Sequence, residues 1–327
     1  MLAGYGRAMT VLDVAQRLLP RRHRTVLIAV HRGGETLHRT VGAAEGSDGE
    51  IGSVSKGMTG LLLHDSIARG EVTTESTLGD TLGLTGALAP VTLGALATHH
   101  GGVPPQPAMG PERPLLRRTW RMWARGENPY GDTLAQLIEQ AESTALGRPG
   151  FVYSNLGFEL LGAALARAAG TTFAALLRDR LTVPLGMTDT YAPATRDELR
   201  PAALTGTSRR GRPHAAWTGE AIAPAGGVRT TAADLGAFVG ALAEGSAPGI
   251  GALDPVAEAG RGARIGAAWI TLEARGRVVT WHNGRTGGFA SFVGVDREAR
   301  AAVGVVSATA AGFDAAGLRM LDAVARA

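Results

Sequence analysis

A serine and a lysine that could act together stand near the beginning of the chain. All but one of the 33 basic residues are arginine, and the exception is Lys56 in the segment IGSVSKGMTG. A guanidinium stays charged at any pH that a protein tolerates, whereas a partly buried ammonium can lose its proton and act as a base. Ser53 precedes Lys56 by three residues at the predicted start of a helix, so their side chains share a face. The pair fits a serine nucleophile that an amine activates, with N–H groups at the helix N-terminus for an oxyanion.

A second group of polar residues, Tyr153-Ser154-Asn155, stands before the apolar segment LGFELLGAALARAAG. Serine and asparagine are favoured at helix starts, so capping explains Ser154 and Asn155 without any chemistry. Capping does not explain Tyr153. Beside Lys56, the Tyr153 hydroxyl could have a lowered pKa and serve as a base or an acid.

The third group is His282-Asn283-Gly284, which follows a β-branched run and precedes RTGGF. Asn-Gly after such a run is a signal for a hairpin turn. The functional interpretation is a strand edge, where small residues let the acyl group of a substrate lie against the backbone.

The elements that must position these groups follow from periodicity and turn signals. The predicted hairpins cover residues 25–42, 264–284 and 289–309, and the predicted helices cover residues 53–70, 133–144, 156–170 and 312–327. Strands at both ends and helices in the middle predict an α+β fold, with one antiparallel sheet made from both termini and an inserted, mostly helical lobe. We expect residues 1–70 and 216–327 to form the α/β lobe and residues 71–215 the helical lobe of one domain.

Composition excludes several kinds of site. The absence of cysteine excludes disulfides, thiolate catalysis and thiolate metal ligands. His99 and His100 are adjacent, so they would point in opposite directions in a strand, and no carboxylate cluster accompanies them. We therefore expect no metal and no cofactor.

Charge and hydropathy bear on partners and location. The formal net charge is +4 and the pI is about 10.1, but the arginines are dispersed, so we expect no nucleic-acid partner. No segment reaches the ~18 apolar residues of a membrane span, and we expect no membrane partner. The N-terminal segment shows no pattern of a signal peptide, which predicts a cytoplasmic protein.

Taken together, the three groups resemble the serine β-lactamase and penicillin-recognising enzyme superfamily, in the branch of class C β-lactamases, D-alanyl-D-alanine carboxypeptidases and related esterases. That family carries S-x-x-K, then Y-x-N roughly a hundred residues on, then K-T-G or H-x-G on a late strand. The segments LATHHGGVP, PLGMTDT and PAGGVRTTAADLGAF are also similar to family segments. The resemblance covers roughly residues 22 to 325.

The resemblance implies a class C β-lactamase-like fold, with the active site between the lobes, and acyl transfer through a serine ester. Ser53 would attack a carbonyl, and Lys56 and Tyr153 together would take its proton and return it to the leaving group; either could be the base. Asn155 would orient Lys56 or the acyl group of the substrate. The oxyanion hole would be the backbone N–H groups of Ser53 and Arg285.

The chain departs from the family pattern at the third motif. His282 replaces lysine, and a histidine with a pKa of about 6.5 is mostly neutral at pH 7 and attracts a substrate carboxylate less strongly. Asn283 replaces the hydroxyl residue that often binds that carboxylate, although Arg285 could restore a positive charge if it points inward. Gly101 replaces a serine that relatives often carry, a change we interpret as structural. These departures argue against an efficient β-lactamase.

We therefore expect a serine hydrolase of a small ester, amide or peptide, similar to esterases and D-alanyl-D-alanine carboxypeptidases. An acyltransferase or transpeptidase-like enzyme that uses the same acyl-enzyme is an alternative, and a penicillin-binding sensor without turnover is another. A loop with Trp120, Trp123 and Tyr130 could roof the pocket and favour apolar acyl groups, or could simply pack the helical lobe.

Overall fold

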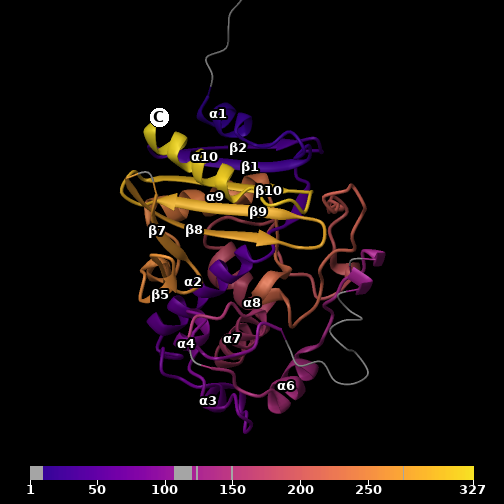
Figure 1. The fold of residues 1–327 in the computed structure, drawn as a ribbon, viewed down its shortest axis with the longest axis vertical. Coiled ribbons are helices and arrows are strands. Elements are labelled where there is room, and N and C mark those ends of the chain that lie inside the picture. The colour runs from indigo at the N-terminus through magenta and orange to yellow at the C-terminus, as the bar shows by residue number, and fades with distance from the viewer. Residues whose placement is uncertain (1–9, 107–119, 123, 149, 275) are drawn as a thin grey trace, which may run out of the picture.

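The computed structural model describes residues 10–106, 120–122, 124–148, 150–274 and 276–327. Its centre is an eight-stranded antiparallel sheet with the strand order β2-β1-β10-β9-β8-β7-β6-β5 (Figure 1). The strands of this sheet are β1 (Val26–Arg32), β2 (Glu35–Val41), β5 (Ala257–Gly260), β6 (Ala263–Ile265), β7 (Ile270–Ala274), β8 (Arg277–Arg285), β9 (Ala290–Asp296) and β10 (Ala301–Ser307). A separate pair, β3 (Asp48–Glu50) and β4 (Arg229–Thr231), is also antiparallel.

Helices cover both faces of the large sheet. They are α1 (Val11–Arg17), α2 (Val54–Ala68), α3 (Leu78–Leu82), α4 (Leu93–Ala97), α6 (Leu134–Ser143), α7 (Asn155–Ala168), α8 (Phe173–Leu177), α9 (Ala232–Glu244) and α10 (Asp314–Arg326). The terminal helices α1 and α10 pack together on one face, and α9 and α2 each pack against strands on the other. Figure 1 shows α3, α4, α6 and α7 gathered at the end of the molecule away from α1 and α10.

The sequence of β1, VLIAV, shows why the sheet is internal. Its alternate side chains belong to two apolar clusters: Leu27 and Ala29 face α9, and Val26, Ile28 and Val30 face α10. Since both faces are covered, the strand reads as a continuous apolar run. The hairpin predicted over residues 25–42 is confirmed as β1 and β2, and β1 joins β10 to complete the sheet from both termini.

The other predicted hairpins and helices are confirmed, but several elements were not predicted. Among them are α1, α9 and the hairpin of β5 and β6. Helix α9 is buried around most of its circumference, so it lacks the amphipathic pattern that marks a surface helix. Strands β5 and β6 are short and partly exposed, which leaves little pattern to detect.

One large apolar cluster joins both predicted lobes, since it contains Leu61, Phe158, Phe238 and Trp269. The lobe boundaries after residues 70 and 215 stay a prediction.

Within the described residues, no single helix has both the length and the apolar composition to cross a bilayer. Helix α7 and the segment Phe173–Thr182, bent by 79° relative to each other, meet that criterion only as a pair.

Candidate active site

Ser53 stands at the N-cap position of α2, but its side chain makes no capping hydrogen bond. Gly52 before it has a φ of +51°, in the left-handed region that glycine adopts without strain. The Ser53 N–H donates no backbone hydrogen bond within the described part of the chain. This turn therefore offers both a hydroxyl that is not used for capping and an N–H donor for a negatively charged oxygen.

The Lys56 amine is buried among three polar neighbours. Its Nζ donates to the Ala225 carbonyl oxygen at 2.6 Å and to Asn155 Oδ1 at 2.7 Å, and it lies 3.3 Å from Ser53 Oγ. An ammonium has three N–H donors, so two are used by these carbonyl oxygens and the third meets Ser53. After loss of that third proton, the lone pair of the amine faces the serine hydroxyl.

The charge state of Lys56 depends on its burial. Loss of hydration lowers the pKa of Lys56 from 10.5 to about 7, while the charge of Glu159 opposes this change. An exposed lysine is fully protonated at neutral pH, whereas about half of the Lys56 amines are neutral at pH 7. Lys56 can therefore act as a base.

The prediction of a lowered pKa for Tyr153 is wrong. Although 40% of the Tyr153 surface is exposed, loss of hydration raises its pKa to about 12, and a hydrogen bond with Ser53 offsets only part of this rise. Lys56 Nζ lies 4.9 Å from the centroid of the Tyr153 ring. The hydroxyl keeps its proton at neutral pH, so Tyr153 can donate a proton and Lys56 can accept one.

Asn155 begins α7 and connects Lys56 to Tyr130, a residue of the predicted roof loop, and through it to Gln106, which was not predicted. Its Nδ2 donates to the Tyr130 hydroxyl at 3.2 Å, while Oδ1 accepts from Lys56. The Tyr130 hydroxyl also contacts the side-chain amide of Gln106, and burial raises the Tyr130 pKa to about 12. Both residues come from irregular segments without periodicity. The aromatic loop drew attention to Tyr130, whereas no sequence pattern marks Gln106.

The capping interpretation is correct for Ser154. Its Oγ accepts the Gly157 N–H at 2.8 Å and donates to the Pro104 carbonyl oxygen at 2.6 Å. The Ser154 N–H donates to His99 Nδ1 at 3.2 Å, and the His99 ring centroid lies 4.6 Å from that of Tyr153. His99 is buried with a φ of +61°, a conformation that residues other than glycine rarely adopt. The buried His99 ring thus packs against the Tyr153 ring.

His282, Asn283 and Gly284 lie within β8, so the hairpin-turn interpretation of Asn-Gly is wrong. The turn comes later, where the Thr286 N–H donates to the Phe289 carbonyl oxygen at 3.0 Å. Strand β8 pairs with β9 as far as Arg285, but β7 pairs with β8 only as far as Trp281. Beyond Trp281, one edge of β8 has no strand partner among the described residues, and it can bind an extended substrate.

Side chains alternate along β8, and this divides the predicted residues between two faces. Gly284 faces Ser53, and His282 shares that face. Asn283 is opposite Phe292 on the face covered by α10, and its role in orienting substrate stays a prediction. The Arg285 side chain is exposed and extends to Gly312, where its Nη2 lies 2.5 Å from the place of a Cβ.

His282 is uncharged. Its Nδ1–H donates a hydrogen bond to the Asn283 carbonyl oxygen at 2.7 Å, which leaves Nε2 of the neutral ring as an acceptor. Burial first, and then the charge of Lys56, lower the His282 pKa to about 4. The described site therefore has no cation at position 282.

Two glycines bring the backbones of β8 and the serine turn together. A Cβ on Gly284 would lie 2.1 Å from the Ile51 carbonyl oxygen and 2.9 Å from the Ser53 nitrogen. A Cβ on Gly52 would lie 2.8 Å from the Arg285 nitrogen. The N–H groups of Ser53 and Arg285 belong to these two touching segments, and together they can hold an oxyanion.

We expect Gly284→Ala to lower kcat/KM for an ester by about 10²–10³-fold, the usual cost of losing one oxyanion donor. The added methyl group forces β8 away from the serine turn. The rate is measured beside the melting temperature, with Gly34→Asn in the β1–β2 turn as a control, since a Cβ there meets nothing within 4 Å. Full activity of a folded Gly284→Ala protein would contradict this oxyanion geometry.

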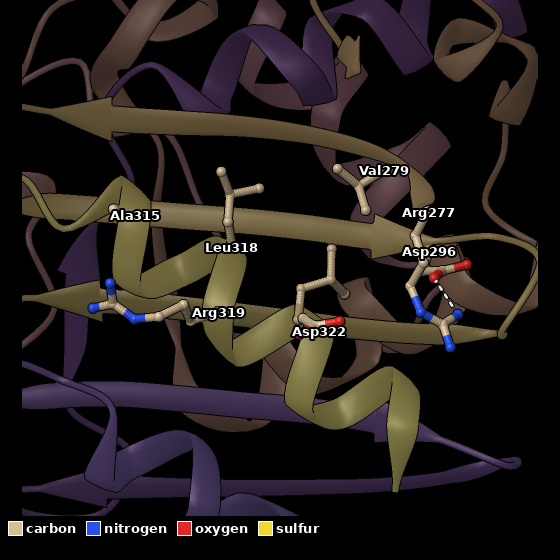
Figure 2. A pocket seen from close by; sticks show the side chains of 8 residues that line it. Arg277, Val279, Asp296, Ala315, Leu318, Arg319 and Asp322 are labelled. Atoms are coloured by element: carbon tan, nitrogen blue, oxygen red, sulfur yellow. Dashed lines mark hydrogen bonds and ion pairs between the residues drawn. The ribbon is translucent and has the colours of Figure 1, made fainter. Parts of the chain in front are cut away.

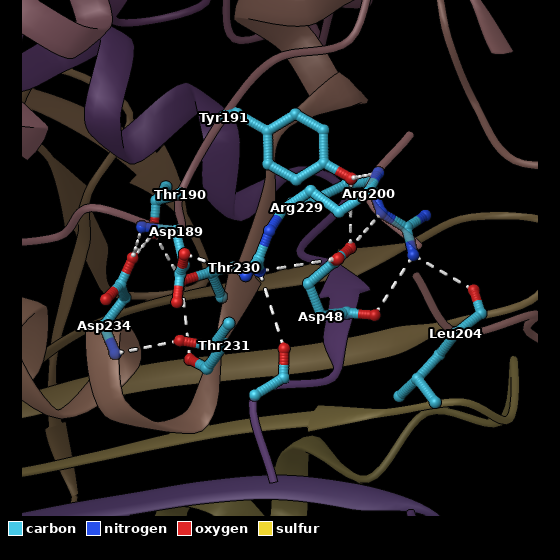
Figure 3. Close-up of polar contacts among 11 residues, drawn as sticks. Asp48, Asp189, Thr190, Tyr191, Arg200, Leu204, Arg229, Thr230, Thr231 and Asp234 are labelled. Atoms are coloured by element: carbon cyan, nitrogen blue, oxygen red, sulfur yellow. Dashed lines mark hydrogen bonds and ion pairs between the residues drawn. The ribbon is translucent and has the colours of Figure 1, made fainter. Parts of the chain in front are cut away.

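A buried ionic network holds the segment that leads to Ser53 (Figure 3). Arg229 on β4 donates Nε to Asp48 at 2.5 Å and Nη1 to Glu50 at 3.2 Å, and all three side chains are buried. Glu50 also accepts the Trp217 N–H at 3.0 Å. Removing one partner of such a network leaves an uncompensated buried charge, so the network stabilises the turn only as a unit. No spacing rule in the sequence marks it.

Two cavities lie away from the Ser53 hydroxyl. The first, about 210 Å³, lies between α10 and β8, where Leu318, Val279 and the Arg277–Asp296 ion pair form its wall (Figure 2). It is on the α10 face of the sheet, opposite to Gly284. The second, about 370 Å³, has Glu50 and His214 in its wall.

The predicted roof loop is only partly described. Trp123 lies outside the described residues. Trp120 is 58% exposed, and the Arg125 guanidinium lies 5.5 Å from its ring centroid. Tyr130 packs against Trp217 with ring centroids 4.7 Å apart and contacts Asn155, which places it beside the site.

Comparison with known proteins identifies the family and the fold. The family model described as Beta-lactamase matches residues 13–327. The D-alanyl-D-alanine-carboxypeptidase/endopeptidase AmpH of Escherichia coli (strain K12) is 34% identical over 112 residues, which are 34% of this chain and only about a quarter (26%) of that relative.

Solved structures share the fold at low sequence identity. A class C β-lactamase from Rhodobacter sphaeroides is 19% identical with a TM-score of 0.78, covering 97% of this chain and 99% of that one. The D-alanine carboxypeptidase AmpC from Burkholderia cenocepacia is 22% identical with a TM-score of 0.77, covering 95% and 97%. The predicted class C β-lactamase-like fold and the resemblance to the superfamily are confirmed. Since the family model matches almost the whole chain, this protein belongs to the Beta-lactamase family.

Proposed function

We propose that this protein is a serine hydrolase that forms an acyl-serine intermediate on Ser53 and acts on a small ester or amide. The observation that carries the proposal is the buried Lys56 amine, 3.3 Å from Ser53 Oγ and with a pKa lowered to about 7. Such an amine can take the proton of a serine hydroxyl at neutral pH.

The reaction begins when Ser53 Oγ attacks the substrate carbonyl carbon and its proton moves to Lys56. The N–H groups of Ser53 and Arg285 hold the oxyanion of the tetrahedral intermediate. The carbonyl–leaving-group bond then breaks, and the leaving alcohol or amine takes up a proton from Lys56 through the Tyr153 hydroxyl. Water attacks the acyl-serine next, which releases the acid and returns the proton to Ser53.

The lack of a nearby guanidinium or imidazolium charge among the described residues and the apolar surface beside the site support an uncharged substrate. His282 is neutral, and the Arg285 guanidinium extends to Gly312. Phe151, Val152 and Tyr153 leave an exposed apolar strip that leads to the site. Because carboxylate recognition in a buried site needs a paired cation, we propose an ester or amide without a carboxylate beside the scissile bond. The name of the relative AmpH makes D-alanyl-D-alanine peptides the natural comparison.

A matched pair of substrates tests this preference. N-acetyl-D-alanyl-D-alanine and its C-terminal methyl ester share one peptide bond and differ in the charge beside it. Cleavage of that peptide bond is followed as release of D-alanine or of D-alanine methyl ester, and p-nitrophenyl butyrate and benzylpenicillin extend the set. We expect kcat/KM to be at least about tenfold higher for p-nitrophenyl butyrate and the methyl ester than for the free peptide and penicillin, since one uncompensated charge costs at least that much. Faster cleavage of the free peptide would overturn the proposed substrate class.

The lifetime of the acyl-enzyme separates the remaining functions. Intact mass spectra during ester turnover show a short-lived adduct for a hydrolase. An adduct that persists without turnover identifies a sensor, and an adduct that an added amine or alcohol resolves faster than water identifies an acyltransferase. Either result would overturn hydrolysis as the function.

A further inference from the structure

Glu159 is a buried carboxylate that the proposed reaction does not use. It follows Asn155 by four residues in α7, so both side chains lie on the same side of that helix. Asn155 holds Lys56 Nζ at 2.7 Å, and α7 packs against α2, which carries Lys56. Glu159 is only 2% exposed. A carboxylate is seldom buried this deeply unless another group compensates its charge.

The titratable groups around Lys56 are neutral apart from Glu159. Burial lowers the pKa of His99 and of His282, and it raises the pKa of Tyr153 and of Tyr130 to about 12. The charge of Glu159 raises the pKa of Lys56, and it acts in the same direction on Tyr130. Both groups bind Asn155, and Glu159 lies about one helical turn beyond Asn155 on the same side of α7.

The elements packed against α7 offer no second carboxylate that acts on Lys56. Helices α4 and α8 and the turn Ala223–Gly227 contain no titratable side chain. The other neighbours carry His64 and Asp65 on α2, Asp80 on α3, and Glu139 and Glu142 on α6. Three of these carboxylates have their own partners: Asp65 pairs with Arg69, Asp80 caps its own helix, and Glu142 accepts the Gly86 N–H. Burial lowers the pKa of His64 and the charge of Asp254 opposes this, and Glu139 is exposed.

We propose that Glu159 is a positioning residue for Lys56. The buried carboxylate of Glu159 balances the Lys56 ammonium and keeps the amine a strong enough base to activate Ser53. Burial alone would make Lys56 a progressively weaker base. A weaker base is neutral at lower pH, but it also takes a proton from serine less readily. The inference rests on the proposed function, in which Lys56 receives the Ser53 proton.

The test uses the fact that Lys56 is the only lysine in the chain. Protein labelled with ¹³C at lysine Cε gives one resonance, and its pH titration reports the protonation of Lys56 directly, without substrate. In Glu159→Gln we expect the midpoint to move to lower pH by about one unit, the usual influence of one nearby charge. The acidic limb of ester kcat/KM should move with it, and the plateau rate should fall several-fold.

Two further variants keep the test decisive. Asp234→Asn removes another buried carboxylate, which accepts the Asp189 N–H at 2.8 Å and does not act on Lys56; we expect it to lower stability without moving the Lys56 titration. Glu159→Asp keeps the charge and should titrate near the wild type, even if Glu159→Gln unfolds. An unchanged Lys56 midpoint in folded Glu159→Gln would overturn the inference. A wild-type protein whose Lys56 titrates near pH 7 but which does not hydrolyse the ester would instead contradict the proposed function.

Discussion

Ser53→Ala abolishes the covalent adduct with acylating substrates and lowers ester hydrolysis by about 10⁵-fold or more, as loss of the nucleophile does in other serine hydrolases. The reason is chemical, because Ser53 Oγ is the hydroxyl that lies within hydrogen-bond reach of the Lys56 amine, 3.3 Å from Nζ. Intact mass spectrometry with a p-nitrophenyl ester, together with release of p-nitrophenol, measures both effects.

Ser55→Ala is the matched control for this variant. Ser55 is a buried serine in the same helical turn, and its Oγ accepts the Val228 N–H at 3.2 Å. We expect Ser55→Ala to lose some stability, because it leaves that N–H unpaired, and to keep its adduct. An adduct of the same mass in Ser53→Ala would show that a different residue is the nucleophile.

Lys56→Arg lowers kcat/KM by about 10²–10⁴-fold, because general-base assistance of that size is lost when the base cannot be deprotonated. In the wild type, the Lys56 pKa of about 7 sets the sign of the pH dependence. The amine is protonated and inactive as a base below pH 7, so activity rises with pH and reaches a plateau above 8. At pH 6 we expect about one-tenth of the plateau rate. Profiles of kcat/KM from pH 5 to 9 measure this.

Tyr153→Phe distinguishes the two possible bases. If Lys56 is the base, this variant is slower at every pH because a proton donor is lost, but its acidic limb stays near pH 7. If the acidic limb of the kcat/KM profile disappears in Tyr153→Phe, or if Lys56→Arg keeps the wild-type pH profile, Tyr153 is the base instead.

Local patterns predicted most of the elements that hold this site. The apolar run of β1, the helical spacing after Ser53 and the apolar segment after Asn155 each identify one element, because a strand or helix buried on a known face imposes its period on the residues. Helix α9 and the β5–β6 hairpin escaped prediction because one is buried almost all round and the other is short and exposed.

The limits of local sequence patterns also apply to the active-site residues. The roles of Ser53, Lys56 and Tyr153 were inferred from residue type and spacing, and the structure brings the three side chains together. The direction of Asn283 depends on its register against Phe292, which a local turn signal does not contain. His99 and Tyr130 reach the site from loops, where no periodicity marks a functional position.

Sequence by itself determined which chemical groups are present: one lysine, a serine three residues before it, and a histidine where relatives carry a cation. Only the tertiary structure decided their charge. The pKa of Lys56 falls to about 7, that of Tyr153 rises to about 12 and that of His282 falls to about 4. The physical reason is that a pKa depends on hydration and on neighbouring charges, and segments far apart in the chain supply both only after folding.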